Sequence, residues 1–260
     1  MTRTPIYLPL AKAALFVETA KHHGDLKGPL GSTADKGADA VKAGTDALAH
    51  ITHHLQTDKL AGHLVHTAAT EVEMWLQTAR FRARKVLGDD HSAIDTLVGA
   101  DLHGDNHTVT VIAQALRFVS ILRMDADLRA QLRSGRMSIE DLLQRGNALM
   151  SRLLRLAEDD AHPHDTDADT HIAPVTAKLE AFIESAHGAA SSALAAEPNL
   201  LGLLGVVTDD NAAPLGGTAT NVTRHQRSHG PAPAPNPAPA APGWSVGRQG
   251  RNNANIGKGY

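Results

Sequence analysis

Apolar residues recur every three or four positions along most of the first 207 residues, the spacing of one face of an α-helix. Polar stretches rich in Gly, Pro or Asp separate these patterned segments. The pattern predicts an all-α fold, a helical bundle of five to six helices. The predicted helices span residues 10–23, 33–56, 58–88, 109–132, 138–156 and 174–197.

Small residues lie within the apolar faces of two of these helices. Gly44 interrupts the apolar seam of residues 33–56, where it allows a neighbouring helix to approach closely. Gly146 lies in the apolar face of residues 138–156. Aromatic residues make up only 3% of the chain. We therefore expect a core of Leu, Val, Ile and Ala with few large rings.

The segments between the helices predict the division of the chain. We expect a loop over 24–32, and a loop over 89–107 that contains about one turn of helix. Residues 158–173 are rich in His and Asp and lack any Lys or Arg, which predicts a solvated acidic linker. The expected parts are a main helical bundle over 1–157, the acidic linker over 158–173, a last helix and apolar segment packed on the bundle over 174–207, and a low-complexity basic tail over 208–260.

The tail differs in composition from everything before it. From residue 212 to the end there are five Lys or Arg residues and no Asp or Glu, and residues 231–242 consist almost entirely of Pro and Ala. Such a segment cannot bury a core and favours extended conformations. We expect a disordered Pro/Ala-rich C-terminal tail.

Hydrophobic and basic side chains punctuate the last part of the tail, after the Pro/Ala run. A folded domain that carries such a segment on a spacer can present it as a docking peptide, with an aromatic residue as the anchor. A low-complexity tail without a partner is the alternative. The predicted docking residues are Trp244, Val246, Arg248, Arg251, Ile256 and Tyr260.

Composition and charge exclude several classes of site. The chain has no Cys, which excludes thiolate zinc sites, iron–sulfur clusters, cysteine nucleophiles and disulfides. A formal charge of −3 gives no overall attraction to nucleic acid or to a membrane surface. The first apolar stretch is too short to span a bilayer, so cytoplasm is the expected location. Nucleophile-elbow and phosphate-loop motifs are absent from the sequence.

A metal site is the main alternative, because the chain contains 16 His residues. Glu184 and His187 form a Glu-x-x-His motif, the arrangement that di-iron helical bundles use. Glu18 or Glu71 could supply a bridging carboxylate, and a symmetric dimer could supply a second motif. The sequence contains one such motif, and a solvated helix face is the favoured explanation for it. The metal would be iron or another divalent ion.

Other polar clusters carry weaker signals, and a surface role is the alternative for each. His50 with His54 and His63 with His66 have the spacing of ligand pairs on one helix face. A loop cluster of imidazoles and a carboxylate precedes or begins the helix at 109–132. Its members are His91, His103, Asp105 and His107. Arg80, Arg82, Arg84 and Lys85 form a basic cluster that we expect on an exposed helix face rather than on nucleic acid.

These observations favour an interaction protein over an enzyme. We expect a non-enzymatic structural or interaction protein that self-assembles or docks to a larger assembly through its C-terminal peptide, with no cofactor. Its partner would be a copy of itself or a larger protein assembly, without a membrane. The alternative is a ferritin-like metal-binding bundle that uses Glu184 and His187.

Overall fold

A computed structural model describes residues 5–54, 59–88, 90–132, 138–161 and 166–207. Within these residues every regular element is a helix, which confirms the all-α fold, and nine helices are present rather than five or six. The helices are α1 (Tyr7–His22), α2 (Gly24–His54), α3 (Lys59–Leu87), α4 (His91–Val98), α5 (His107–Met124), α6 (Ala126–Gln131), α7 (Ile139–Ala161), α8 (Thr166–Ala193) and α9 (Pro198–Leu203).

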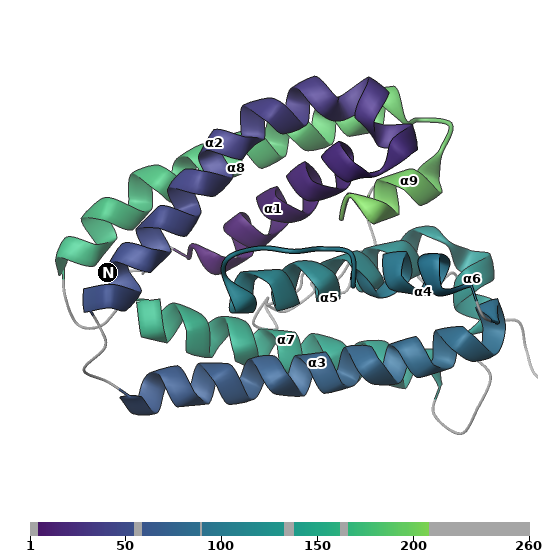
Figure 1. Ribbon diagram of the computed structural model, residues 1–260, viewed down its shortest axis with the longest axis horizontal. Coiled ribbons are helices and arrows are strands. Elements are labelled where there is room, and N and C mark those ends of the chain that lie inside the picture. Colours follow the sequence, from purple (N-terminus) through teal and green to yellow (C-terminus); the bar gives the residue numbers. More distant parts are fainter. Residues whose placement is uncertain (1–4, 55–58, 89, 133–137, 162–165, 208–260) are drawn as a thin grey trace, which may run out of the picture. The chain divides into compact units, whose positions relative to one another are not determined.

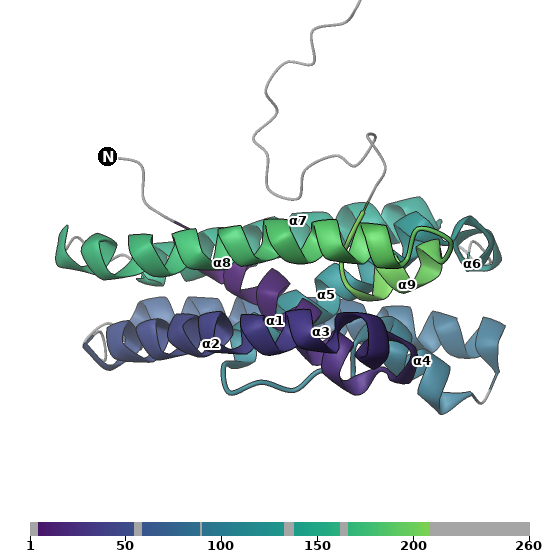
Figure 2. The same ribbon diagram turned by 90° about the horizontal axis from the view of Figure 1, so that it is seen from above.

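Helix α1 lies at the centre of the bundle. It packs against α2 and α8 on one side and against α5 on the other (Figure 1). Helix α3 packs against α7, α4 and α5, and the turned view shows α7 and α8 in a layer apart from α2 and α3 (Figure 2). Most of the buried residues of α1 are aliphatic or small, and Tyr7 and Phe16 are the aromatic ones among them.

Three short helices, α4, α6 and α9, raise the count above six. The helix predicted over 109–132 is two helices, since Asp125 ends α5 in an extended conformation and caps α6 by accepting a hydrogen bond from Leu128 N at 2.8 Å. The helical turn predicted within 89–107 is α4, and Asp90 caps it. The apolar segment near residue 200 forms α9.

The loop predicted over 24–32 is wrong, because α2 begins at Gly24 and continues through Pro29. Leu26 and Leu30 are fully buried against Phe16 of α1 and Ala186 of α8. Pro29 is the sixth residue of α2, past the first turn, so the helix lacks the hydrogen bond that an N–H at this position would make. Burial of the two leucines therefore outweighs the local Gly/Pro signal.

Helix also occupies both ends of the predicted linker over 158–173. Helix α7 continues to Ala161 and α8 starts at Thr166. One of the linker's acidic residues has a structural role: the Glu158 carboxylate accepts hydrogen bonds from Ile6 N at 3.1 Å and Tyr7 N at 2.8 Å. These bonds satisfy the free N–H groups at the start of α1 and place a negative charge at its positive end.

The largest rings of the core lie over glycine residues. Trp75 of α3 covers Gly146 of α7, and its indole Nε1 donates to Leu142 O at 2.8 Å. Phe182 of α8 covers Gly37 of α2 in the same way. The close approach predicted at Gly44 is confirmed, because Leu10 and Leu179 occupy the space that a Cβ would fill. Within the described residues, none of the helices combines the length and the apolar character that crossing a membrane requires.

We predict that Gly146→Ala destabilises the fold, because the added Cβ would lie 2.1 Å from Trp75 Cζ2. The expected loss is about 1–3 kcal/mol in the free energy of unfolding, measured by urea denaturation. Gly188→Ala is the matched control: it is an exposed glycine within α8 with nothing within 4 Å of the added Cβ. The control should gain up to about 1 kcal/mol. Equal stability of Gly146→Ala and the unchanged protein would contradict this packing.

Candidate functional site

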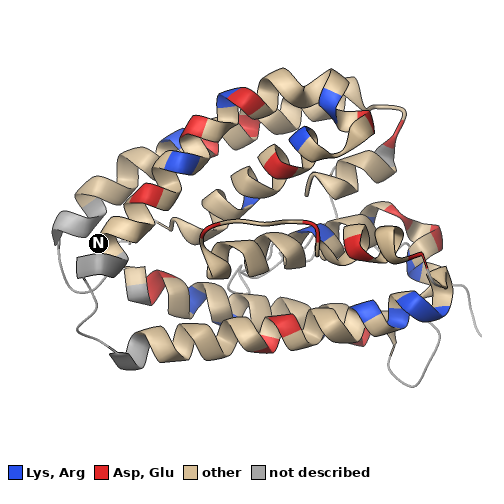
Figure 3. Cartoon of the chain, in the orientation of Figure 1, with Lys and Arg blue, Asp and Glu red and all other residues tan. Residues whose placement is uncertain are grey.

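Lys, Arg, Asp and Glu residues are spread along the helices (Figure 3). Among the described residues, Arg117 of α5 is the only charged residue that is buried, with 1% of its surface exposed. Its guanidinium donates to Asp101 Oδ1 at 2.5 Å and to Thr19 Oγ1 of α1 at 2.6 Å. Burial lowers the pKa of Arg117, and the hydrogen bond and charge of Asp101 oppose this effect.

The Arg117 contacts hold three segments together rather than forming a reaction centre. Thr19 donates its own hydroxyl proton to Leu15 O at 2.6 Å, so its oxygen is oriented to accept from Arg117. Arg117 is not among the functional residues predicted from the sequence. Its burial could have been inferred, because it is the only charged residue between 109 and 122, in a helix with apolar residues on all sides.

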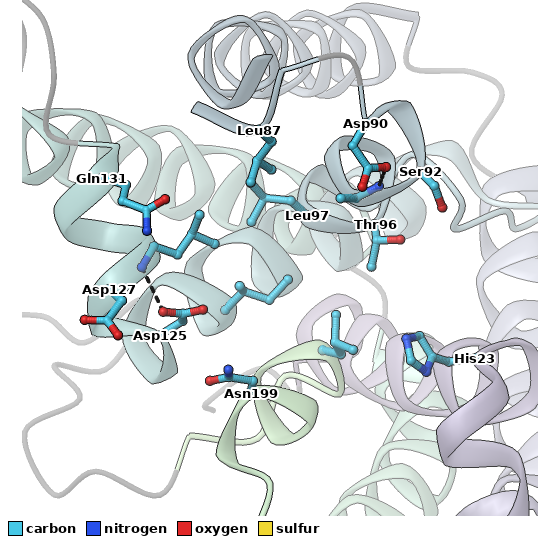
Figure 4. A pocket seen from close by; sticks show the side chains of 14 residues that line it. His23, Leu87, Asp90, Ser92, Thr96, Leu97, Asp125, Asp127, Gln131 and Asn199 are labelled. Atoms are coloured by element: carbon cyan, nitrogen blue, oxygen red, sulfur yellow. Dashed lines mark hydrogen bonds between the residues drawn. The ribbon is translucent and has the colours of Figure 1, made fainter. Parts of the chain in front are cut away.

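A cleft of about 660 Å³ lies between α4, α6 and α9. Its floor is apolar and includes Leu97, Ile121 and Leu203. Figure 4 shows Asp125 and Asp127 on one side of the cleft, and Asp90 and the His23 ring on the other. The lining residues come from His23, from the segment between Leu87 and Gln131, and from α9, so no single sequence motif indicates the cleft.

The rim of this cleft is acidic. Asp90 and Asp125 each use one carboxylate oxygen to cap a helix, and Asp127 lies in the first turn of α6. None of the 14 lining residues is Lys or Arg, and the buried Nδ1 of His23 has no hydrogen-bond partner among the described residues. The cleft thus suits a cation that carries an apolar part, since carboxylates attract the charge while the floor receives the apolar atoms.

The predicted metal pair lies on α8, with its two side chains in different surroundings. Glu184 is exposed, whereas His187 is partly buried. Burial lowers the pKa of His187 to about 4, and the positive charge of Lys12 on α1 contributes to this effect. Within the described residues no three His, Asp or Glu side chains are grouped closely enough to hold a metal ion. The Glu-x-x-His site stays a prediction that elemental analysis would test.

Several of the other predicted clusters are brought together across helices instead of within one. His66 of α3 lies beside His107 at the start of α5, with ring centres 6.2 Å apart, and His107 Nε2 lies 3.7 Å from Glu73. His50 lies beside His171, with ring centres 6.3 Å apart. The side chain of His54 lies outside the described residues.

The loop cluster is only partly assembled. His103 and Asp105 line a smaller cleft of about 280 Å³ next to Glu18 of α1, whereas His91 lies apart at the start of α4. All six predicted docking residues of the tail, from Trp244 to Tyr260, lie outside the described residues. Comparison of the chain with protein-family models, with curated proteins and with solved structures finds no match.

We predict that His187 makes stability fall as the solution becomes acidic. Its pKa is 6.5 when unfolded and about 4 when folded, so between these values the unfolded chain binds the proton and the folded protein does not. The contribution is complete above about pH 6.5 and is lost as the pH falls toward about 4, on the order of 2 kcal/mol. Urea denaturation at several pH values measures it.

His187→Gln should remove this part of the pH dependence, because glutamine does not titrate. His91→Gln is the matched control, since His91 is an exposed helical histidine away from α8. An unchanged slope of stability against pH in His187→Gln would contradict the assignment.

Proposed function

We propose that this chain is a non-enzymatic interaction protein that associates with copies of itself, or with a larger assembly, through its C-terminal peptide. The observation that carries the proposal is the sequence of residues 231–260, a Pro/Ala run followed by Trp244 among basic residues. A Pro-rich spacer holds a peptide away from the folded domain, and tryptophan is enriched among the residues that dominate binding energy.

The folded domain supports this role by fixing the point from which the peptide departs. The described chain ends at Val207, directly after α9. Leu201, Leu204 and Val206 are all buried. Their burial fastens the end of the described chain to the bundle.

Two glycines allow α9 and the residues after it to lie this close to the bundle. A Cβ at Gly202 would lie 3.0 Å from the Cα of Ile121 on α5. Gly205 has φ of +74° and lies against Leu15 of α1. A left-handed backbone conformation favours glycine, so the chain after α9 turns where it does because residue 205 has no side chain.

The positive charge of the tail favours partners that have an acidic surface. The five basic residues of the tail have no acidic residue beside them, so an acidic surface on the partner would increase the rate of association. The attraction should weaken as salt concentration rises, because exposed charges are screened. The tryptophan contribution should be less sensitive to salt.

We predict that deletion of residues 231–260 lowers the molar mass of the assembly while helicity is unchanged. Trp244→Ala should also weaken the assembly and lower its apparent affinity at least tenfold, because removal of an anchor costs more than about 1.4 kcal/mol. Size-exclusion chromatography with light scattering measures the mass, and circular dichroism measures helicity.

Arg224→Ala with Arg227→Ala is the matched control. These two residues are also basic tail residues, but they precede the Pro/Ala spacer, so they should have a smaller effect than Trp244→Ala. Two results together would contradict docking through the peptide. The full chain and the deletion would have the same mass at all concentrations and salt conditions, and no larger partner would bind the full chain without also binding the deletion.

A further inference from the structure

Helix α3 presents three large apolar side chains to solvent, Leu64, Met74 and Phe81, and the last two are the most exposed. Met74 is 66% exposed and Phe81 is 62% exposed, whereas most large apolar residues of the described chain are buried. The two residues are seven positions apart, which places them on the same face of the helix about two turns apart. This face points away from the core, because Trp75 and Leu76 cover the opposite face.

Grooves run along both sides of this exposed face. On one side, between α3 and α7, a groove of about 400 Å³ extends from Met74 to Leu149. On the other side, between α3 and the α4–α5 region, a groove of about 410 Å³ extends from Met74 to Val98. A ridge of side chains with a groove on each side is the surface into which another helix packs.

The charges on α3 are separated along its length. Figure 3 shows acidic residues near the middle of α3 and basic residues toward its C-terminal end. Glu71 and Glu73 form the acidic group, and Arg82 and Arg84 belong to the basic group. This distribution is complementary to itself when a second α3 runs in the opposite direction.

We propose that α3 of a second copy of this chain packs antiparallel on this face, around a two-fold axis between Gln77 and Thr78. Met74 and Phe81 lie equally far from that midpoint, so each copy's Met74 faces the other copy's Phe81. On one edge of the face Glu73 faces Arg84, and on the other edge Glu71 faces Arg82. A helical wheel places each of these pairs on the same edge, since Glu73 and Arg84 differ by about 20° at 100° per residue.

A second copy fits this face because each contact is made twice. A two-fold interface pairs the same surface with itself, so an acidic half and a basic half on one helix are both satisfied. About 20 residues of each α3 overlap in this register, a length of roughly 30 Å. Of the basic cluster that the sequence predicts on an exposed face, Arg84 and Lys85 are exposed, whereas Arg80 is half-buried and pairs with Asp95 of α4. The proposed dimer gives the exposed part of that cluster a partner.

The edge that contains Glu73 and Arg84 supplies the ion pairs that favour the antiparallel dimer. On the other edge, Glu71 already lies 2.6 Å from Arg152 of α7, and Arg82 contacts Ser138 O at 3.4 Å. Glu73 has only His107, at 3.7 Å, and exposed Arg84 has no ion-pair partner within the described part of the chain. The copy-to-copy pair of Glu73 with Arg84 therefore gives Arg84 its counter-charge.

This dimer does not require the C-terminal peptide, so the test uses the full chain with Trp244→Ala to remove the proposed tail anchor. Sedimentation velocity over a concentration series should show a dimer in equilibrium with monomer. Arg84→Glu places two carboxylates opposite each other at both ends of the interface, and the dimer dissociation constant should rise at least tenfold. Glu73→Arg combined with Arg84→Glu exchanges the charges and should restore it to within about threefold.

Lys178→Glu on α8 is the matched control, because it reverses an exposed charge on a helix that packs against α1 and α2 rather than α3. It should leave the dissociation constant unchanged, and circular dichroism should show equal helicity in all variants. A chain that stays monomeric with Trp244→Ala, or a double variant that dimerises no better than Arg84→Glu, overturns the proposal. If the unchanged chain shows no association that depends on Trp244 while the dimer of the Trp244→Ala chain is intact, the proposed function alone is wrong.

Discussion

The scarcity of large side chains constrains the whole bundle. A core of Ala, Leu, Val and Ile fills space only when the helices approach closely, so two of the few large rings lie where the facing helix has no side chain. Gly146 gives this space to Trp75, and Gly37 gives it to Phe182. The first contact joins α3 to α7 and the second joins α2 to α8. The pairing of the longest helices therefore depends on two glycines.

Polar contacts fix the position of the central helix α1 relative to the two helix pairs, α3 with α7 and α2 with α8. Glu158 of α7 satisfies the N-terminus of α1, and Arg117 of α5 binds Thr19 near its C-terminal end. Both contacts lie in partly or fully buried surroundings, where an unsatisfied polar group would be costly. Shape thus sets the spacing of the helices, and these hydrogen bonds set the position of α1 along its axis. Because Trp75 faces inward, the face of α3 that carries Met74 and Phe81 is exposed to solvent.

The sequence predicts those features that depend on local periodicity. The helix beginning near residue 138 and the small-residue seam at Gly44 follow from the spacing of apolar residues, and both are present. The helical conformation around Pro29 could not be predicted, because it depends on burial of Leu26 and Leu30 against distant helices. The acidic cleft and the cap by Glu158 likewise join residues far apart in the sequence. The tail, in contrast, is characterised by its composition alone.

Two separate surfaces would then give the chain its capacity to assemble: a helix face with self-complementary charge and a peptide beyond the bundle. The absence of cysteine allows the first to be tested directly with a single introduced thiol. The measurement is oxidative crosslinking of the full chain with Gln77→Cys, compared with His63→Cys on the same helix. The antiparallel register predicts a disulfide-linked dimer for Gln77→Cys and little for His63→Cys. Equal crosslinking of the two, or none for Gln77→Cys, would contradict it.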